Sequence, residues 1–202
     1  MKIGIMGGTF DPIHNAHLML AEYAYRKYRL DEVWFMPNGN PPHKQNQKCR
    51  TDAGSRAEMV RLAIAGREGF RLEEYEIRRK EISYSYETLE HFRAVFPGHH
   101  FYFIIGADSL FSIESWVHPE RLLKTCTILA ACRAEVNRHD IMEEKIRELN
   151  RKYKADIRLL ITPVSGTASQ IIRQKCRNGS SIAEEVPEAV EAYIISHHLY
   201  QN

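Results

Sequence analysis

Short apolar runs alternate with amphipathic segments along the whole chain. The apolar runs are rich in Val, Ile, Leu and Phe, as buried strands are, and they cover residues 2–6, 33–37, 101–105, 127–132 and 157–161. Residues 70–77 are also extended in character. Elsewhere apolar residues recur every three or four positions, which predicts helices over residues 16–28, 55–64, 89–96, 140–153, 169–178 and 187–197.

The order of these elements predicts the fold class. Strands that alternate with helices favour an α/β fold of the Rossmann-like, doubly wound type, with a mainly parallel sheet and helices on both faces. The chain has 202 residues, of which 44% are hydrophobic and 27% charged, with no repeat, linker or low-complexity tract. We therefore expect one domain over residues 1–202.

Charge and cysteine usage narrow the function classes. The net charge of +2 is too small to indicate a nucleic-acid or membrane surface, so phosphorylated small molecules are the better candidates. The cysteines have no disulfide or zinc-ribbon spacing; they are Cys49, Cys126, Cys132 and Cys176. Together with the lack of a signal-peptide pattern or a membrane-length apolar run, this predicts reduced thiols and a cytoplasmic protein.

The turn after the first strand has the composition of a phosphate-binding loop. Gly7 and Gly8 allow a tight or left-handed turn and a close approach of the backbone to a ligand. We expect Asn15 to cap the following helix, so that unpaired N–H groups face an anion. His14 and His17 could then donate to phosphate oxygens in a transition state. The alternatives are half of a metal site, or a histidine on the surface.

Two further segments carry candidate binding groups. Residues 38–54 form a long loop in which Pro41 and Pro42 stiffen the presentation of a cation, Lys44, although such a segment can also be only a turn. Ser169 and Arg173 repeat the opening design, a strand followed by a hydroxyl-rich turn and a helix start. This second segment predicts another anion cradle.

The strand over residues 101–105 is followed by Gly106 and Asp108, at the end of the sheet where open parallel sheets bind ligands. Asp108 could contact a ribose or a metal, or it could cap the next helix. Trp116 could be a core residue or a stacking platform, and composition alone favours the core. The hydroxyl cluster before the helix over residues 89–96 includes Ser85 and is another candidate site.

Taken together, these motifs resemble a known family. The opening Gly-Gly-Thr-Phe-Asp-Pro-x-His-x-x-His is similar to the signature of the nucleotidyltransferase superfamily. The motifs at residues 41–44, 83–88, 106–108 and 172–173, with Trp116, resemble those of bacterial nicotinate-nucleotide adenylyltransferases. The resemblance implies transfer of an adenylyl group from ATP to nicotinate mononucleotide in NAD biosynthesis, with in-line attack and no covalent enzyme intermediate. It leaves a homo-oligomer open.

The resemblance also implies roles for individual residues. The ATP-binding set is Gly7, Gly8, Thr9, Phe10, His14, His17, Gly106, Asp108, Ser169 and Arg173. The nicotinate mononucleotide set is Thr9, Lys44, Ser85, Trp116 and Arg133, with Trp116 stacked on the pyridine ring. The catalytic set is His14, His17, Lys44 and Arg173. Mg²⁺ would arrive with ATP rather than in a dedicated protein site.

Two departures and two rival functions complete the sequence-based expectations. Ala16 stands where glycine is usual between the two histidines, and Ser169 lies in a run that has fewer hydroxyl groups than the family pattern. A related enzyme that adenylylates phosphopantetheine shares the opening motif but not the Pro-Pro-His-Lys loop. A regulatory protein that binds a nucleotide without turnover is the second rival.

Overall fold

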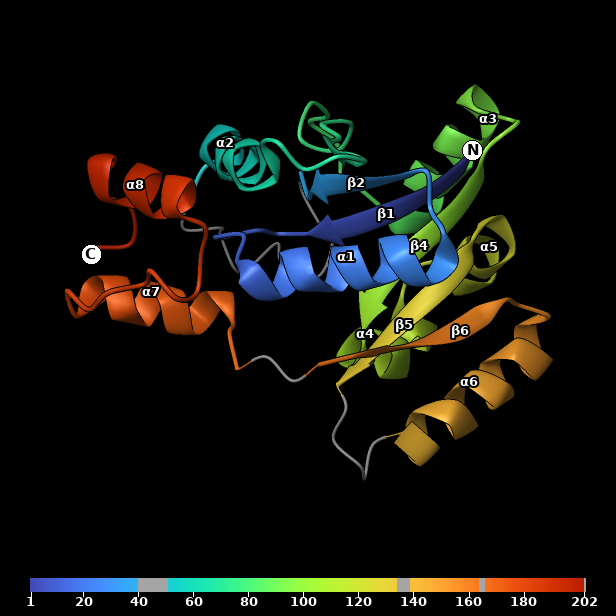
Figure 1. The fold of residues 1–202 in the computed structure, drawn as a ribbon. Coiled ribbons are helices and arrows are strands. Elements are labelled where there is room, and N and C mark those ends of the chain that lie inside the picture. The colour runs from blue at the N-terminus through green and yellow to red at the C-terminus, as the bar shows by residue number, and fades with distance from the viewer. Residues whose placement is uncertain (40–50, 134–138, 164–165, 202) are drawn as a thin grey trace.

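Six parallel strands form one sheet in the computed structural model, which describes residues 1–39, 51–133, 139–163 and 166–201 (Figure 1). The strand order is β3-β2-β1-β4-β5-β6. The strands are β1 (Lys2–Gly8), β2 (Glu32–Pro37), β3 (Phe70–Leu72), β4 (His100–Gly106), β5 (Thr127–Arg133) and β6 (Ile157–Thr162). The predicted doubly wound α/β fold is confirmed, and the sheet is parallel at every pairing of the described strands.

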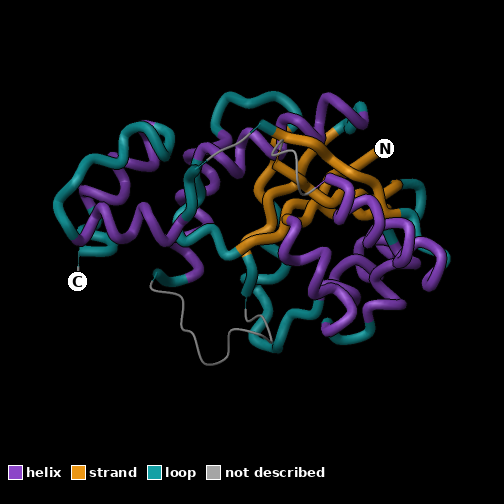
Figure 2. The backbone as a smooth tube through the Cα atoms, turned by 90° about the horizontal axis from the view of Figure 1, so that it is seen from below, coloured by secondary structure: helices purple, strands orange, loops and turns teal. Residues whose placement is uncertain are grey.

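The helices cover both faces of the sheet (Figures 1 and 2). One hydrophobic cluster joins the sheet to α1 (Asn15–Tyr28), α2 (Ala53–Ile64), α7 (Ser169–Arg177) and α8 (Glu188–Ser196). The other cluster joins the opposite face to α3 (Ser85–Val95), α4 (Ala107–Ser112), α5 (Pro119–Thr125) and α6 (His139–Tyr153), and the short 3₁₀ turn η2 (Ile113–Ser115) packs there too. These clusters explain why the strands read as continuous apolar runs: both of their faces are buried.

The strand order reverses between β1 and β4, which pair directly, with Met6 opposite Ile104. In doubly wound sheets the crevice beyond the carboxyl ends of the strands at such a point is the usual ligand site. The turn after β1 and the start of α4 both lie there, and α7 and α8 extend beyond the arrowhead of β1 (Figure 1). The fold therefore places the predicted motifs at one end of the sheet.

The predicted start of α2 was wrong. We expected a capping box from Ser55 to Glu58, but α2 begins at Ala53 and is capped by Asp52, whose carboxylate accepts the Ser55 N–H at 2.9 Å. The charged carboxylate is the stronger acceptor and lies three residues earlier.

The strand predicted over residues 70–77 is also shorter in the structure. β3 ends at Leu72, and the last bond to β2 is from Glu73 N–H to the Phe35 carbonyl at 2.8 Å. The chain then turns, with Arg78 N–H bonding the Glu74 carbonyl at 3.1 Å. Within the described ranges, no helix is both long enough and apolar enough to cross a membrane.

Candidate active site

The turn between β1 and α1, residues 9–14, is buried and held by side chains from distant segments; we call it the β1–α1 turn. Phe10 has a left-handed backbone with φ 50° and is 2% exposed. Neither Gly7 nor Gly8 has a positive φ, so of the tight or left-handed turn that the sequence allowed, the left-handed alternative does not occur at these glycines. Glycine at position 8 is explained by close packing instead, because an added Cβ would lie 3.1 Å from the Phe10 ring.

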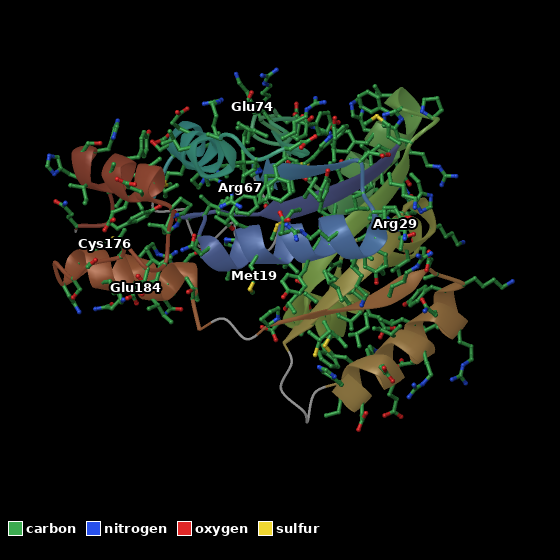
Figure 3. The ribbon with its side chains drawn as sticks, viewed as in Figure 1. Met19, Arg29, Arg67, Glu74, Cys176 and Glu184 are labelled. Carbon is green, nitrogen blue, oxygen red and sulfur yellow. The ribbon has the colours of Figure 1, made fainter. Side chains whose placement is uncertain are left out.

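Asn15 does not cap α1, contrary to the sequence prediction. His14 is the N-cap, with extended backbone angles, and Asn15 is the first helical residue. The Asn15 side-chain amide donates to the Glu184 carbonyl at 2.9 Å, and its N–H donates to the Glu185 carbonyl at 2.8 Å. Glu184, labelled in Figure 3, lies between α7 and α8. The polar groups of Asn15 are therefore used to attach the start of α1 to this C-terminal segment.

His14 and His17 stand together at the start of α1. Their rings are stacked with centroids 3.7 Å apart, and the Phe10 ring meets His17 edge-on at 5.1 Å. The His14 N–H donates to His17 Nδ1 at 3.3 Å. A ring nitrogen that accepts this bond carries no proton in the neutral tautomer, so the proton of His17 is on Nε2. The geometry thus makes His17 a hydrogen-bond donor through Nε2.

Both imidazoles are neutral near pH 7. Burial lowers the pKa of His14 to about 4, and a backbone hydrogen bond opposes this shift only in part. Burial lowers the pKa of His17 well below its usual range, and the neighbouring His14 lowers it further. His14 Nδ1 is buried without a hydrogen-bond partner. With its ring proton on Nδ1, His14 can donate to an anionic ligand at the helix start.

Arg56 is part of the site and was missed by the sequence analysis. It is 2% exposed and donates from Nη1 to the Thr9 carbonyl at 2.7 Å and from Nη2 to the Asn38 carbonyl at 2.9 Å. Asn38 N–H in turn donates to the Gly8 carbonyl at 2.8 Å. Arg56 therefore joins the chain after β1 to the chain after β2.

A signal for Arg56 was present in the sequence. It lies three and four residues before Met59 and Val60, both of which are fully buried on α2. An arginine at a core-facing helix position must find partners, because an unpaired buried charge is very unfavourable. The spacing therefore indicated a buried guanidinium, although it could not indicate which carbonyls would accept its bonds.

Ser169 and Arg173 of α7, the residues of the predicted second anion cradle, contact the β1–α1 turn. Ser169 Oγ donates to the Pro12 carbonyl at 2.9 Å, and Arg173 Nη1 donates to the Asp11 carbonyl at 2.5 Å. Arg173 Nε is buried without a partner. The start of α7 is thus hydrogen-bonded to the β1–α1 turn, and the Arg173 guanidinium still has one buried N–H group, at Nε, that can donate to a ligand.

The other side of the crevice is more open. Gly106 is the N-cap of α4, and Asp108 is exposed in the first turn of that helix, so the alternative that Asp108 caps the helix is wrong. Trp116 is half-buried and meets the Phe103 ring edge-on at 6.5 Å. Ser85 is the half-buried first residue of α3. α3 packs beside the Trp116 segment, because the Tyr86 and His118 rings lie 5.1 Å apart.

The sequence analysis also missed a buried carboxyl group, that of Glu76. Glu76 is 3% exposed and accepts a bond from Thr88 Oγ1 at 2.9 Å and another from the Gly39 N–H. Burial raises the pKa of Glu76 to about 7, against the opposing effects of Thr88 and of the nearby Arg79 charge. Glu76 thus ties the end of β2 to the start of α3.

Two predicted site residues are not placed. Lys44 lies outside the described residues. Arg133 is the last residue of β5, and its side chain lies outside the description. Within the described ranges, no group of three or more His, Cys, Asp or Glu side chains could hold a metal ion.

The chain is similar to known proteins over almost its whole length. The cytidylyltransferase-like family model matches residues 5–181. A probable nicotinate-nucleotide adenylyltransferase of Lachnoclostridium phytofermentans is 43% identical over 199 residues, which cover 98% of each chain. The corresponding protein of Clostridium tetani is 38% identical over 99% of each chain. The chain belongs to the nicotinate-nucleotide adenylyltransferase family.

Solved structures of nicotinate-nucleotide adenylyltransferases share the fold. The Plasmodium falciparum nicotinic acid mononucleotide adenylyltransferase complexed with NaAD superposes with a TM-score of 0.79, at 21% identity over 98% of this chain and 97% of that one. The same Plasmodium enzyme complexed with APC gives a TM-score of 0.76 at 21% identity, covering 98% of this chain and 96% of that one. The family membership implied by the sequence motifs is therefore confirmed, and so is the fold class.

Proposed function

We propose that the chain transfers an adenylyl group from ATP to nicotinate mononucleotide, giving deamido-NAD and pyrophosphate, with residues 1–202 acting as one nucleotidyltransferase domain. The stacked His14–His17 pair at the start of α1 is the observation that carries the proposal of catalysis. The acceptor is supported by the full-length relatives, which are named for this activity, and by the solved relative complexed with NaAD.

The triphosphate of ATP binds at the β1–α1 turn in this proposal. The N-terminal end of the 14-residue α1 carries the positive end of the helix dipole, although the Asn15 N–H is already bonded to the Glu185 carbonyl. Gly7, Gly8, Thr9 and Phe10 would supply the backbone next to the nucleotide, and Gly106 and Asp108 would contact its ribose region across the switch point.

His17 acts on the transferred group. The phosphate of nicotinate mononucleotide attacks the α-phosphorus of ATP in line, and negative charge grows on the bridging oxygen toward pyrophosphate. His17 Nε2–H, whose tautomer follows from the His14 N–H bond, donates to the phosphate oxygens as that charge develops. A neutral imidazole does this without a change of protonation state, and burial keeps both histidines neutral. His14 Nδ1 is the second buried group available to the same phosphates.

The leaving pyrophosphate is held by Arg173 and Ser169 in this proposal. Arg173 already touches the β1–α1 turn through Nη1 and has buried N–H capacity left at Nε. Guanidinium groups suit phosphate oxygens because they present parallel donors. Lys44 adds a further cation near the reacting phosphates in this proposal, as the family motif implies.

The pyridine nucleotide lies on the open side of the crevice. Trp116 is half-buried, so one part of the indole is available to stack on a flat ring. Ser85 at the start of α3 would meet the nicotinate carboxylate, where the helix N-terminus also favours a negative charge. Thr9 and Arg133 complete the proposed acceptor set.

Mg²⁺ enters with the nucleotide in this proposal. The described residues offer no cluster of three or more metal-binding side chains, and the exposed Asp108 carboxylate at the switch point is the group suited to meet a triphosphate-bound ion. When bound, the ion would neutralise part of the triphosphate charge.

An acceptor comparison tests the function. Pyrophosphate release from ATP is measured with nicotinate mononucleotide, nicotinamide mononucleotide and phosphopantetheine as alternative acceptors. We expect deamido-NAD formation with the first acceptor and little product with phosphopantetheine. Absence of turnover with either pyridine nucleotide would contradict the proposal and favour a nucleotide-binding regulatory protein, whereas turnover only with phosphopantetheine would favour the related adenylyltransferase.

A further inference from the structure

Tyr200 lies far from the β1–α1 turn in sequence but is bonded to it. Its hydroxyl donates to Asp11 Oδ1 at 2.7 Å, across a separation of 189 residues. Tyr200 is 7% exposed and Asp11 is 5% exposed, so the bond is shielded from water. The Tyr200 ring belongs to the hydrophobic cluster formed by α1, α2, α7 and α8. The Tyr200 hydroxyl therefore donates a buried hydrogen bond to the Asp11 carboxyl group of the turn.

The backbone of Tyr200 is itself strained. It has φ 64°, in the left-handed region that a bulky side chain rarely adopts. A residue keeps such a conformation only where its surroundings enforce it, and such strain is concentrated at functional sites. The buried ring and the bond to Asp11 are the contacts that hold it.

Two other polar residues lie close to the Tyr200 hydroxyl. The Thr51 side chain also hydrogen-bonds it, and Arg173 is close enough to act on its charge. Burial raises the pKa of Tyr200 far above its usual range, and the Asp11 carboxylate raises it further, so the hydroxyl stays protonated and donates. Thr51 is 5% exposed and lies just before α2. Tyr200 thus touches both the β1–α1 turn and the start of the element that carries Arg56.

We propose that Tyr200 is a positioning residue for the ATP-phosphate site: its hydroxyl fixes Asp11, and through Asp11 the β1–α1 turn, in the conformation that binds the triphosphate. The proposal rests on the function proposed above. Asp11 is the residue whose carbonyl also accepts the bond from Arg173, so its side chain and its backbone are held from two directions. Loss of either hold would loosen the turn that leads into His14 and His17.

A purely structural role would use the ring of Tyr200 rather than its hydroxyl, and the test separates the two. Tyr200→Phe keeps the ring and removes the bond to Asp11. Tyr28→Phe is the matched control, because the Tyr28 hydroxyl donates at 3.1 Å to the Leu159 carbonyl, away from the β1–α1 turn. The full-length variants are compared by steady-state kinetics, by calorimetric titration with ATP and by urea unfolding.

We expect Tyr200→Phe to raise the KM and the Kd for ATP about 10-fold, the scale for a displaced binding group, while the KM for nicotinate mononucleotide changes less than about twofold. Tyr28→Phe should leave all three constants within about twofold of the parent protein, with a loss of stability similar to that of Tyr200→Phe. Equal ATP constants for the two variants would overturn the proposal.

A double-mutant cycle provides a second, independent test. In an Asp11→Ala background the hydroxyl of Tyr200 has no carboxyl group to hold, so Tyr200→Phe should change ATP binding less than about twofold. If Tyr200→Phe weakens ATP binding equally in the Asp11→Ala background, Tyr200 does not act through Asp11, and the proposal is overturned. The ATP titration needs no turnover. The positioning role of Tyr200 can therefore be disproved while adenylyl transfer is observed, and it can be confirmed even if the acceptor proposed above is wrong.

Discussion

The β1–α1 turn and the β4–α4 segment lie at the same end of adjacent strands but are built differently. The turn is buried and accepts bonds from Arg56 on α2 and Arg173 on α7. Gly106 and Asp108 of the β4–α4 segment are exposed. Within this segment Ser112 Oγ donates to the Asp108 carbonyl four residues earlier, at 2.9 Å.

The difference follows from the demands on each side of an adenylyl-transfer site. Groups that stabilise developing charge act best when they are already oriented, because no reorganisation is then needed as the reaction proceeds. A platform for a flat ring needs only an available face, so it can be exposed before the ligand binds. In the proposed function, the buried side of the site therefore carries the phosphate chemistry and the open side carries the acceptor. Four variants test this contrast, in order of expected effect.

Arg56→Met should destabilise the protein by about 3 kcal/mol, because two charged hydrogen bonds are lost and two partly buried carbonyl groups lose their donors. Urea unfolding measures this change. The control is Arg61→Met on the same helix, whose side chain is 53% exposed and pairs with Glu58 and Glu74; its effect should stay within about 0.5 kcal/mol. Equal losses from the two variants would show that the turn is not held from α2.

His17→Ala should lower kcat by more than about 100-fold, the scale for one lost transition-state donor. His17→Gln should recover part of the rate, because its side-chain amide can place an N–H where Nε2 stood. His197→Ala is the control, since that histidine is exposed and stacks on Tyr193 at 4.0 Å. An unchanged kcat for His17→Ala would remove its proposed role.

Glu76→Gln should change the pH dependence of stability. The pKa of Glu76 is raised to about 7 by burial, so the folded protein retains this proton between pH 4.5 and 7 while the unfolded chain has released it. Stability of the parent protein therefore falls as pH rises through this window. Glutamine stays neutral, so its stability relative to the parent should rise by about 2 kcal/mol between pH 5.5 and 8.

Denaturant unfolding at both pH values measures that difference, and any constant effect of the altered hydrogen bonds cancels. Thr88→Val provides a contrast: it removes the donor to Glu76 but leaves the carboxyl group in place, so the parent's fall in stability with pH should persist. A pH-independent difference between Glu76→Gln and the parent would mean that folding does not raise the pKa of Glu76.

Trp116→Ala should raise the KM for nicotinate mononucleotide about 10-fold, the scale of a lost stacking contact, while the KM for ATP changes little. Trp116→Phe should recover most of the loss. Phe111→Ala removes a neighbouring aromatic side chain that is 43% exposed and should leave both constants within about twofold. A rise in the KM for ATP alone would place the indole on the wrong side of the proposed site.

The sequence by itself determined most of the strands and longer helices, and the motif at the start of α1; it did not predict the bounds of α4 or α5. Apolar runs buried on both faces predicted five strands within a residue or two of their ends, and the two histidines marked the start of α1. These predictions succeeded because they depend on local patterns, in which apolar periodicity reports burial and residue spacing reports a helix face. Family membership could be recognised for the same reason, because each motif is a short, continuous stretch of sequence.

Only the tertiary structure decided how the site is held. Local propensity chose Asn15 as the cap, but a carbonyl 169 residues away takes its side chain and leaves His14 in that place. Arg56 finds its acceptor 47 residues back along the chain, and Tyr200 finds Asp11 across 189 residues. A helical period shows that a polar side chain faces the core, but its partner depends on which segments the fold brings together. That is a property of the packed chain and of no local stretch of it.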